Sequence, residues 1–410
     1  MRQKLLYITP VLPAITGNGL AMRAGSVLEA LAARYRVSLM VVQLYASVDA
    51  ALPPVFAAMC ERHVVLPAGA VRRVYRAADF DCIHVFRLAS VAFLSACVDL
   101  SGRPFMQLDL DDIESKANRR LADLYRLNGC EDEAARLDRE AARLAKTEDD
   151  ALGRFSRVFV CSSCDQRELQ ARSRTEIAVL PNTIRPAAPT SARSENEDVF
   201  RFLFVGSLGV YANEDAVVYF CDRILPILRR EAPRPFVVHV VGTCPSARQL
   251  EIAESAGVRV VGPVPEVASW YRAADAVIVP LRTGGGTRIK ILEAFDHGCP
   301  VVTTSLGSEG LDVRDGQHLL IADHPGAFAD CCRLLMEDRS LAQRIGENAG
   351  ALLRERYVMA RLQKVVASFA DFPVPRRSPS DALRSWSSYI SRRFDREPVV
   401  CAYPGRRSPP

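Results

Sequence analysis

The chain has 410 residues, of which 49% are apolar and 25% are charged, and its formal net charge is +5. This length predicts two to three domains, each large enough for its own core, and the composition is typical of a globular enzyme. The positive charge is spread too thinly to indicate nucleic-acid binding, but it suits an acidic small molecule or an anionic membrane surface.

Targeting and metal signals are weak. No apolar run is long enough for a transmembrane helix, and the N-terminal apolar stretch is too short for a signal peptide, so we expect a cytoplasmic protein, at most peripheral at the inner membrane face. Without an export signal, the twelve cysteines are expected to be mainly buried thiols. Cys161-Ser-Ser-Cys164 has the spacing of a redox or half-zinc motif, yet no second pair accompanies it. We therefore expect no metal and no cofactor.

Strand-like apolar runs alternate with helical patterns through the first half of the chain. Leu5–Thr9 predicts a strand, a loop with Gly17 and Gly19 follows, and residues 21–31 predict a helix before the strand Val37–Val42. This alternation predicts a parallel sheet wrapped by helices. Residues 115–150 predict one or two long amphipathic helices. The other expected strands of this half are His63–Leu66, Cys82–Phe86, Phe105–Asp109, Val158–Cys161 and Ile177–Leu180.

A change of composition separates the two halves. Residues 186–199 are rich in proline, small and charged residues and predict a linker, so the first domain is expected over 1–185. A second βα series then defines a domain over 200–355. Its expected strands are Phe202–Gly206, Phe236–Gly242, Val258–Gly262, Ala276–Pro280, Pro300–Thr304 and Leu319–Ile321. The fold class is therefore α/β, with two doubly wound Rossmann-like domains facing a central cleft as the default ligand site.

The C-terminal part divides into two further segments. Residues 356–372 predict a helix that packs back toward the N-terminal domain. Residues 373–410 are rich in Pro, Ser and Arg and predict a mobile basic tail. Within this tail, residues 381–394 have the pattern of a short amphipathic helix with basic flanks, which is the basis for expecting contact with a membrane surface; a solvated tail is the alternative.

The stretch that follows the run Ala276–Pro280 has the chemistry of an anion site. Three glycines, Gly284, Gly285 and Gly286, allow backbone N–H groups to approach a ligand closely. Thr287 is expected to cap the helix that follows, and Arg288 and Lys290 place two cations at its start. The ligand expected here is a phosphate pair.

Ordered motifs across roughly 350 residues resemble the GT-B glycosyltransferases, and within them glycosyltransferase family 4, also called group 1. The closest matches are Phe204–Gly209 with Asn213, Trp270–Asp275, Gly284–Ala294, Gly298–Val302 and Gly307–Gly310. The N-terminal half matches more loosely, through Pro13–Gly19, Asp109–Ser115, Cys161–Ser163 and Leu180–Asn182. The resemblance implies metal-independent, hexosyltransferase-like transfer with retention from a nucleotide-sugar donor, a UDP- or GDP-sugar.

The resemblance also assigns a donor site. Glu293 matches the second glutamate of the family's Glu-x7-Glu motif, which holds the ribose; an ion pair with Lys290 is the structural alternative. Two departures stand out. Gly285 occupies the position of the first glutamate, and no Arg or Lys follows Gly206, so Arg288 and Lys290 are expected to stabilise the leaving diphosphate. The expected donor-binding set is Glu293, Gly284, Gly285, Gly286, Thr287, Gly206, Ser207, Gly307 and Glu309.

Candidates on the acceptor side follow strands of the first domain. Asp111 and Asp112 are candidate catalytic residues beside Arg288 and Lys290, with helix capping by Asp112 as the alternative. Gly17 and Gly19 form either a phosphate or acceptor loop or an ordinary strand–helix turn.

His84 and Arg87 complete the acceptor-side candidates. Arg87 suits an anionic acceptor such as a lipid-linked diphosphate, and His84 is either a site residue or a core histidine.

The function that fits these patterns is sugar transfer to a glycan or lipid-linked acceptor in polysaccharide or envelope-glycan biosynthesis. The missing glutamate at position 285 leaves an alternative, an inactive nucleotide-sugar-binding or regulatory protein of the same fold. A Rossmann dehydrogenase is disfavoured because Gly17-Asn-Gly19 lacks the third glycine of the dinucleotide motif.

Overall fold

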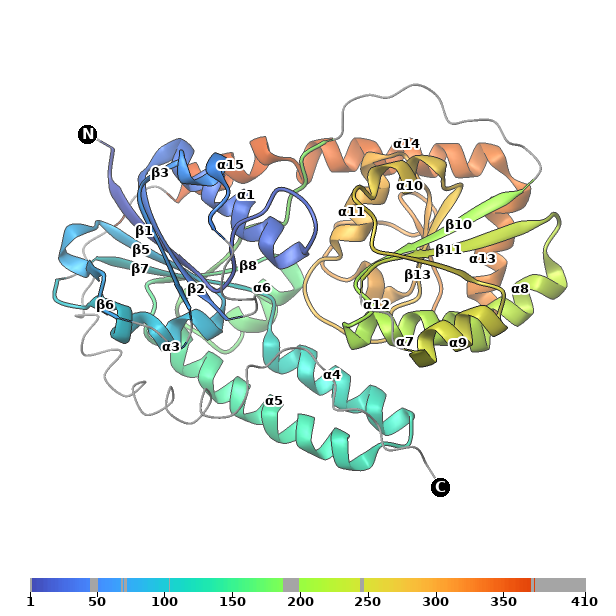
Figure 1. Cartoon of the computed structure of the whole chain (residues 1–410), viewed down its shortest axis with the longest axis horizontal. Helices are drawn as coiled ribbons and strands as arrows, with labels where there is room; N and C mark the ends of the chain where they lie inside the picture. The colour runs from blue at the N-terminus through green and yellow to red at the C-terminus, as the bar shows by residue number, and fades with distance from the viewer. Residues whose placement is uncertain are drawn as a thin grey trace. The chain divides into compact units, whose positions relative to one another are not determined.

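The computed structural model describes residues 2–44, 51–67, 69, 72–102, 104–186, 199–243, 247–369 and 372, which form two compact units (Figure 1). Unit 1 takes the described residues of Met1–Arg119, Arg136–Thr183 and Met359–Val400, and unit 2 those of Arg120–Ala135 and Ile184–Val358. Positions 187–198 of the expected linker, the expected tail 373–410 and its amphipathic pattern lie outside the described residues.

Unit 1 is built on a seven-stranded parallel sheet in the order β3-β2-β1-β5-β7-β8-β9. Its strands are β1 (Lys4–Thr9), β2 (Arg36–Gln43), β3 (Cys60–Pro67), β5 (Cys82–Phe86), β7 (Phe105–Asp111), β8 (Arg157–Val160) and β9 (Glu176–Val179). The inner strands are buried on both faces, as β5 shows with all five residues buried, because helices cover both sides of a parallel sheet. A two-stranded sheet of β4 (Tyr75–Arg76) and β6 (Val98–Asp99) adjoins the short η2 (Ala77–Asp79).

The helices of unit 1 form around this sheet (Figure 1). They are α1 (Gly19–Arg34), α2 (Pro54–Ala57), α3 (Leu88–Cys97), α4 (Glu114–Leu127), α5 (Glu131–Leu152), α6 (Ser163–Gln170) and α15 (Met359–Ser368). Helices α4 and α5 form a hairpin that breaks at Gly129, whose φ of +73° favours glycine. The tip of this hairpin, Arg120–Ala135, belongs to unit 2. Helix α15 packs against α1, with Leu362 and Val366 buried in the same core.

Unit 2 is built on a six-stranded parallel sheet in the order β12-β11-β10-β13-β14-β15. Its strands are β10 (Phe200–Val205), β11 (Phe236–Val241), β12 (Arg259–Gly262), β13 (Ala276–Val279), β14 (Val301–Thr303) and β15 (Leu320–Ile321). Its helices are α7 (Tyr211–Tyr219), α8 (Leu225–Glu231), α9 (Ala247–Ser255), α10 (Ala268–Ala273), α11 (Ile289–Asp296), α12 (Ser305–Ser308), α13 (Pro325–Glu337) and α14 (Arg339–Arg356), with a π-helical turn, η3 (Phe220–Ile224), between α7 and α8. The expected fold class, two doubly wound α/β domains, is confirmed.

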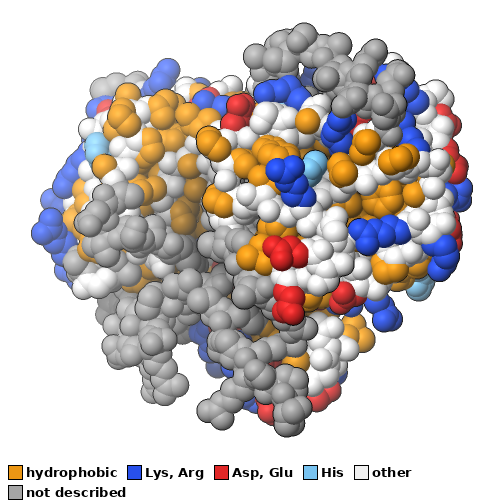
Figure 2. Space-filling model, turned by 45° about the vertical axis from the view of Figure 1, so that its right-hand side comes forward, with side chains coloured by type: hydrophobic (Ala, Val, Ile, Leu, Met, Phe, Trp, Pro, Cys, Tyr) orange, Lys and Arg blue, Asp and Glu red, His pale blue; other side chains and the backbone are white. Residues whose placement is uncertain are grey.

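Charged side chains of both signs are mixed with apolar ones on one face of the surface (Figure 2). On the face drawn in Figure 2, basic side chains lie in separate small groups among acidic and apolar ones. Within the described part of the chain, every helix is too short or too polar to cross a lipid bilayer.

Helix α14 packs closely on the end of α11, and glycine makes this contact possible. A Cβ added to Gly346 would lie 2.3 Å from the carbonyl oxygen of Gly298, which is backbone and therefore cannot move aside cheaply. We expect Gly346→Ala to lower the free energy of unfolding by about 1–3 kcal/mol, measured as a lower melting temperature. The matched control is Gly326→Ala in α13, whose Cβ would meet nothing within 4 Å. The control should leave stability unchanged or raise it slightly; equal melting of the two variants would contradict the packing argument.

Candidate functional site

The polar groups of unit 2 gather where its strand order reverses. Strand β10 pairs with β11 on one side and with β13 on the other, so the chain turns in opposite directions after these two strands. Gly206 directly follows β10, and the loop 280–288 follows β13. Ligands of open parallel sheets bind outside the carboxyl ends of the strands at such a reversal.

The glycine loop after β13 has a backbone that only glycine adopts readily. Gly284 has a φ of +122° and Gly286 a φ of +65°. The Arg288 guanidinium turns back onto this loop, where its Nη1 donates to the carbonyl oxygens of Gly285 and, at 2.9 Å, of Gly286. Its Nη2 lies 3.5 Å from the carbonyl oxygen of Leu306. Arg288, expected to face an anion, therefore holds the loop in this conformation.

The expected capping of α11 by Thr287 is wrong. The helix begins at Ile289, and Arg288 occupies the cap position without a side-chain capping bond. The reason is the positive φ of Gly286, which turns the chain so that Thr287 is buried before the helix starts.

Lys290 lies in the first turn of α11 and points toward the end of β10. Its Nζ donates to Oδ1 of Asn213 at 2.7 Å and lies 4.1 Å from the centre of the Phe204 ring. Burial, reinforced by the nearby charge of Arg288, lowers the pKa of Lys290 to about 7, although Glu293 opposes this shift. Lys290 is therefore not the permanent cation that its residue type suggests, because near neutral pH it gains and loses its proton.

Glu293 lies one turn further along α11. Its Oε2 accepts a hydrogen bond of 2.9 Å from the hydroxyl of Tyr271 in α10. Burial raises the pKa of Glu293, and the Tyr271 hydrogen bond and Lys290 act against that shift. The structure thus pairs Glu293 with Tyr271, and the amine of Lys290 turns to Asn213 instead.

The segment after β10 is tied to Lys290 through Asn213. The Asn213 side-chain amide donates to the carbonyl oxygen of Ser207 at 2.9 Å, and the Ser207 hydroxyl lies 3.0 Å from that of Thr243. A Cβ on Gly206 would lie 2.7 Å from Nζ of Lys290, so the backbone and the amine are in close contact. Gly206, Ser207 and Lys290 are therefore brought together.

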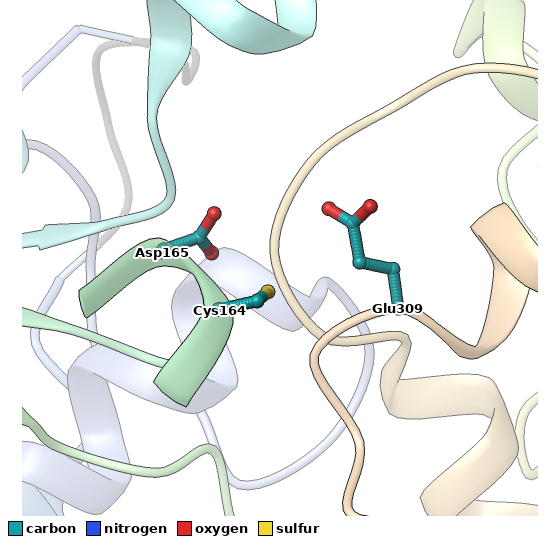
Figure 3. Close-up of side chains that lie close together, drawn as sticks. All are labelled: Cys164, Asp165 and Glu309. Atoms are coloured by element: carbon teal, nitrogen blue, oxygen red, sulfur yellow. The ribbon is translucent and has the colours of Figure 1, made fainter. Parts of the chain in front are cut away.

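The segment after β14 completes this edge of unit 2. A Cβ on Gly307 would lie 2.1 Å from Oγ1 of Thr303, so only glycine fits there. Glu309 directly follows α12, and its side chain is drawn in Figure 3. Its carboxylate accepts two hydrogen bonds from Arg120, at 2.9 and 2.7 Å. Arg120 was missed in the sequence, where nothing in its local pattern distinguishes it from the other arginines of α4.

A second polar cluster lies at the carboxyl ends of β5 and β7 in unit 1. Arg87 donates to Asp112, to Glu114 at 3.0 Å and to the carbonyl oxygen of Leu110 at 3.1 Å, and lies 3.5 Å from Asp111. Arg87 and Asp111 have φ values of +69° and +67°, which cost non-glycine residues energy and are found where surrounding contacts enforce them. The expected anionic partner of Arg87 is thus replaced here by the protein's own carboxylates.

Beneath this cluster lies a buried ion pair. Arg23 of α1 donates to Asp109 at 2.8 Å and to Asn182 at 2.9 Å, and its Nε lies 3.3 Å from Asp111. The side chains of Arg23 and Asp109 are 2% and 0% exposed. Burial raises the pKa of Asp111, Arg23 opposes the shift and Asp112 reinforces it.

The remaining candidates of unit 1 are His84, which lies in the core, and Gly17 and Gly19, which lie near the start of α1. His84 is 1% exposed and packs between the rings of Tyr7 and Phe159, which corresponds to the core alternative. Burial lowers its pKa. Gly17, with a φ of +98°, precedes Asn18, whose side chain accepts a hydrogen bond from the N–H of Leu20 and so caps α1, which begins at Gly19. These two glycines therefore lie where the loop after β1 enters α1.

The Cys161-Ser-Ser-Cys164 motif lies at the start of α6. Both cysteines are free thiols, and Cys161 is buried. Cys164 and Asp165 project from the first turn of the helix (Figure 3). Asp165 accepts hydrogen bonds from the Ser162 hydroxyl at 2.7 Å and from Lys116 at 2.9 Å.

Comparisons with known proteins bear mainly on unit 2. Residues 199–338 match the family model described as "Glycosyl transferases group 1". The D-inositol 3-phosphate glycosyltransferase of Paenarthrobacter aurescens is 28% identical over 203 residues, which cover 46% of this chain and 48% of that protein. The chain thus matches about half the length of this relative.

Solved structures cover more of the chain at lower identity. Sucrose-phosphate synthase from Thermosynechococcus elongatus has a TM-score of 0.66 at 16% identity and covers 90% of this chain and 98% of its own. The Anabaena protein HepE, solved in complex with UDP and glucose, has a TM-score of 0.64 at 15% identity and covers 90% and 99%. At these identities the likeness establishes the fold.

The buried pair of Arg23 and Asp109 gives a prediction about stability. We expect Arg23→Met to lower the free energy of unfolding by about 3–5 kcal/mol, because it leaves a carboxylate buried without its cation. Arg36→Met is the control, since Arg36 and Glu61 form a pair with side chains 42% and 41% exposed; its cost should be about 0–1 kcal/mol. Chemical denaturation measures both, and equal costs would show that burial does not set the strength of these pairs.

Proposed function

We propose that this chain, whose residues 199–338 form a group 1 glycosyl transferase domain on a GT-B fold, transfers a sugar from a nucleotide-diphosphate sugar to a hydroxyl of a glycan or lipid-linked acceptor. One observation carries the proposal. The glycine loop, Lys290 and Glu293 lie together on the loop and first turns that follow β13, at the strand reversal of unit 2.

The donor diphosphate binds at the first turn of α11. Lys290 and the N–H groups of residues 284–286 supply positive charge there, and the helix N-terminus adds to it. Glu293 accepts hydrogen bonds from the vicinal hydroxyls of the ribose, because one carboxylate can serve two neighbouring hydroxyls. The Tyr271 hydroxyl fixes the orientation of Glu293 for this purpose.

Catalysis rests on charge that grows on the leaving phosphate as the glycosidic bond breaks. A cation and aligned N–H dipoles at this phosphate stabilise the transition state more than the ground state, which is the role a metal ion has in other transferases. Arg288 contributes by shaping the loop that presents these N–H groups. We propose metal-independent transfer with retention, to be read from the anomeric configuration of the product.

The acceptor binds at the cluster of unit 1. Arg87 forms ion pairs with Asp112 and Glu114, so this cluster has more carboxylates than arginines. Carboxylates accept hydrogen bonds, and the hydroxyl groups of a sugar can donate them. Asp111 and Asp112 are the proposed acceptor-side residues, and polysaccharide or envelope-glycan assembly is the proposed setting.

A second function is favoured by Gly285, which stands where family 4 has its first glutamate. In this reading the chain binds a nucleotide sugar without turning it over. The two functions differ in one measurement, the release of nucleoside diphosphate from the donor that the protein binds.

The test begins with thermal stabilisation by UDP, GDP and ADP and their sugars, followed by turnover with the nucleotide that stabilises. We expect Lys290→Met to lower kcat/KM by roughly a hundredfold or more, about 3 kcal/mol, because it removes charge from the leaving phosphate. Glu293→Gln should mainly raise KM. Lys364→Met, an exposed lysine of α15, serves as control. Stabilisation by no nucleotide would overturn the proposal, and binding without turnover would leave the second function.

The pKa of Lys290 predicts that donor binding is coupled to proton uptake. In the free protein this pKa is lowered to about 7. A diphosphate beside the amine favours the charged form and raises its pKa, so above pH 7 the complex holds more protons than the free protein. Affinity for the nucleotide should be constant below pH 7 and fall as the pH rises above it, by at most about tenfold per pH unit.

Calorimetry at pH 8 in buffers of different ionisation enthalpy measures this proton uptake directly. The uptake should be absent in Lys290→Met. An uptake of the same size in that variant would show that another group takes the proton.

A further inference from the structure

We propose that Arg120 is a positioning residue of the donor site, which fixes the direction of the peptide group between Gly284 and Gly285. The inference rests on the proposed function, because it deepens the account of how the glycine loop meets the donor. Arg120 belongs to unit 2 together with the loop and with Glu309.

The contacts of Arg120 are directional. Its Nη1 donates to the carbonyl oxygen of Gly284 at 3.1 Å and to Oε1 of Glu309 at 2.9 Å, and its Nη2 donates to Oε2 of Glu309 at 2.7 Å. The side chains of Arg120 and Glu309 are 24% and 26% exposed. The two parallel bonds to one carboxylate hold the guanidinium plane, so the third bond reaches Gly284 in a fixed direction.

The bond to Gly284 determines where the next N–H group points. A trans peptide is planar, and its C=O and N–H bonds point in opposite directions. Fixing the Gly284 carbonyl toward Arg120 therefore aims the N–H of Gly285 away from Arg120. Gly284 and Gly285 have no Cβ to restrict this peptide, and Arg288 holds the next two carbonyl oxygens, of Gly285 and Gly286, so the hydrogen bond from Arg120 is the one that sets the Gly284 carbonyl.

The rest of the hairpin tip supports this placement of Arg120. The Tyr125 ring stacks on that of Tyr211, with centroids 4.6 Å apart and planes at 10°, and the Asn128 side-chain amide donates to the Tyr211 hydroxyl at 3.2 Å. Tyr211 opens α7 after β10. The tip thus contacts the segments that follow β10, β13 and β14, all at the carboxyl edge of one sheet.

The position also explains how the chain tolerates glycine at 285. Because glycine has no side chain, position 285 offers a ligand no carboxylate. The group that remains for contact with a ligand is its backbone N–H. An N–H group stabilises a developing charge only if it is already oriented. Arg120 supplies that orientation from outside the loop.

The experiment compares Arg120→Met, Glu309→Gln and the double variant, with Arg119→Met as control because Arg119 is exposed on the same helix. The first measurement is the 15N–1H heteronuclear NOE of the amides of residues 282–288 in the free protein, which reports how firmly each peptide group is held. We expect a lower NOE at Gly285 in both single variants, and no further decrease in the double variant. An unchanged NOE in Arg120→Met would overturn the inference.

The second measurement is the affinity for UDP and for GDP, by calorimetry. Arg120→Met should weaken the binding of the preferred nucleotide by roughly tenfold and raise KM more than it lowers kcat. Arg120→Lys should not restore binding, because an ammonium group lacks the planar fork; full rescue by lysine would show that charge alone matters and would also overturn the inference.

The two measurements separate this inference from the proposed function. If the unmodified protein binds neither nucleotide, the proposed function fails, and the heteronuclear NOE of residues 282–288 still decides whether Arg120 positions the loop. If the protein binds nucleotide and the variants bind equally well, only the role of Arg120 is refuted. Glu309→Gln reports on the same contact from the other partner should Arg120→Met fail to fold.

Discussion

The common direction of the strands in unit 2 is the constraint on which its polar edge depends. Because β10, β13 and β14 run parallel, their carboxyl ends meet at one edge and deliver Gly206, the glycine loop and Glu309 to it, although these residues are far apart in sequence. The reversal of strand order between β10 and β13 keeps helices from covering this point. The apolar strands beneath it, such as the fully buried β13, make the edge rigid.

Burial then sets the chemistry of the charged groups. Burial and the nearby charge of Arg288 disfavour the charged form of Lys290, and they outweigh Glu293, which favours it. For Arg23 in unit 1 the net shift has the opposite sign. Burial lowers the pKa of Arg23, but the charges of Asp109 and Asp111 outweigh burial, so this pKa is raised. A ligand that brings negative charge to Lys290 therefore changes its state, whereas the charge of Arg23 is already compensated.

The strands could be predicted from the sequence because buried parallel strands are uninterrupted apolar runs; Cys82–Phe86, for example, is β5 itself. The fold, and the match of residues 199–338 to the group 1 glycosyl transferase model, followed from ordered motifs in unit 2. The start of α11 was mispredicted because Thr287 has the residue type of a cap, and the positive φ of Gly286 that displaces it cannot be read from composition. The contact of Arg120 with Gly284 spans 164 residues, so no local pattern reveals it. The lowered pKa of Lys290 likewise depends on burial, which only the fold defines.

The state of Lys290 has a consequence for chemical reactivity. A lysine with a pKa of about 7 is present to a large extent as a free amine at neutral pH, whereas ordinary surface lysines are almost entirely ammonium ions. The free amine is the nucleophilic form, so Lys290 is suited to selective acylation or imine formation with mild electrophiles. A reagent that labels this amine would therefore mark the first turn of α11, next to the glycine loop.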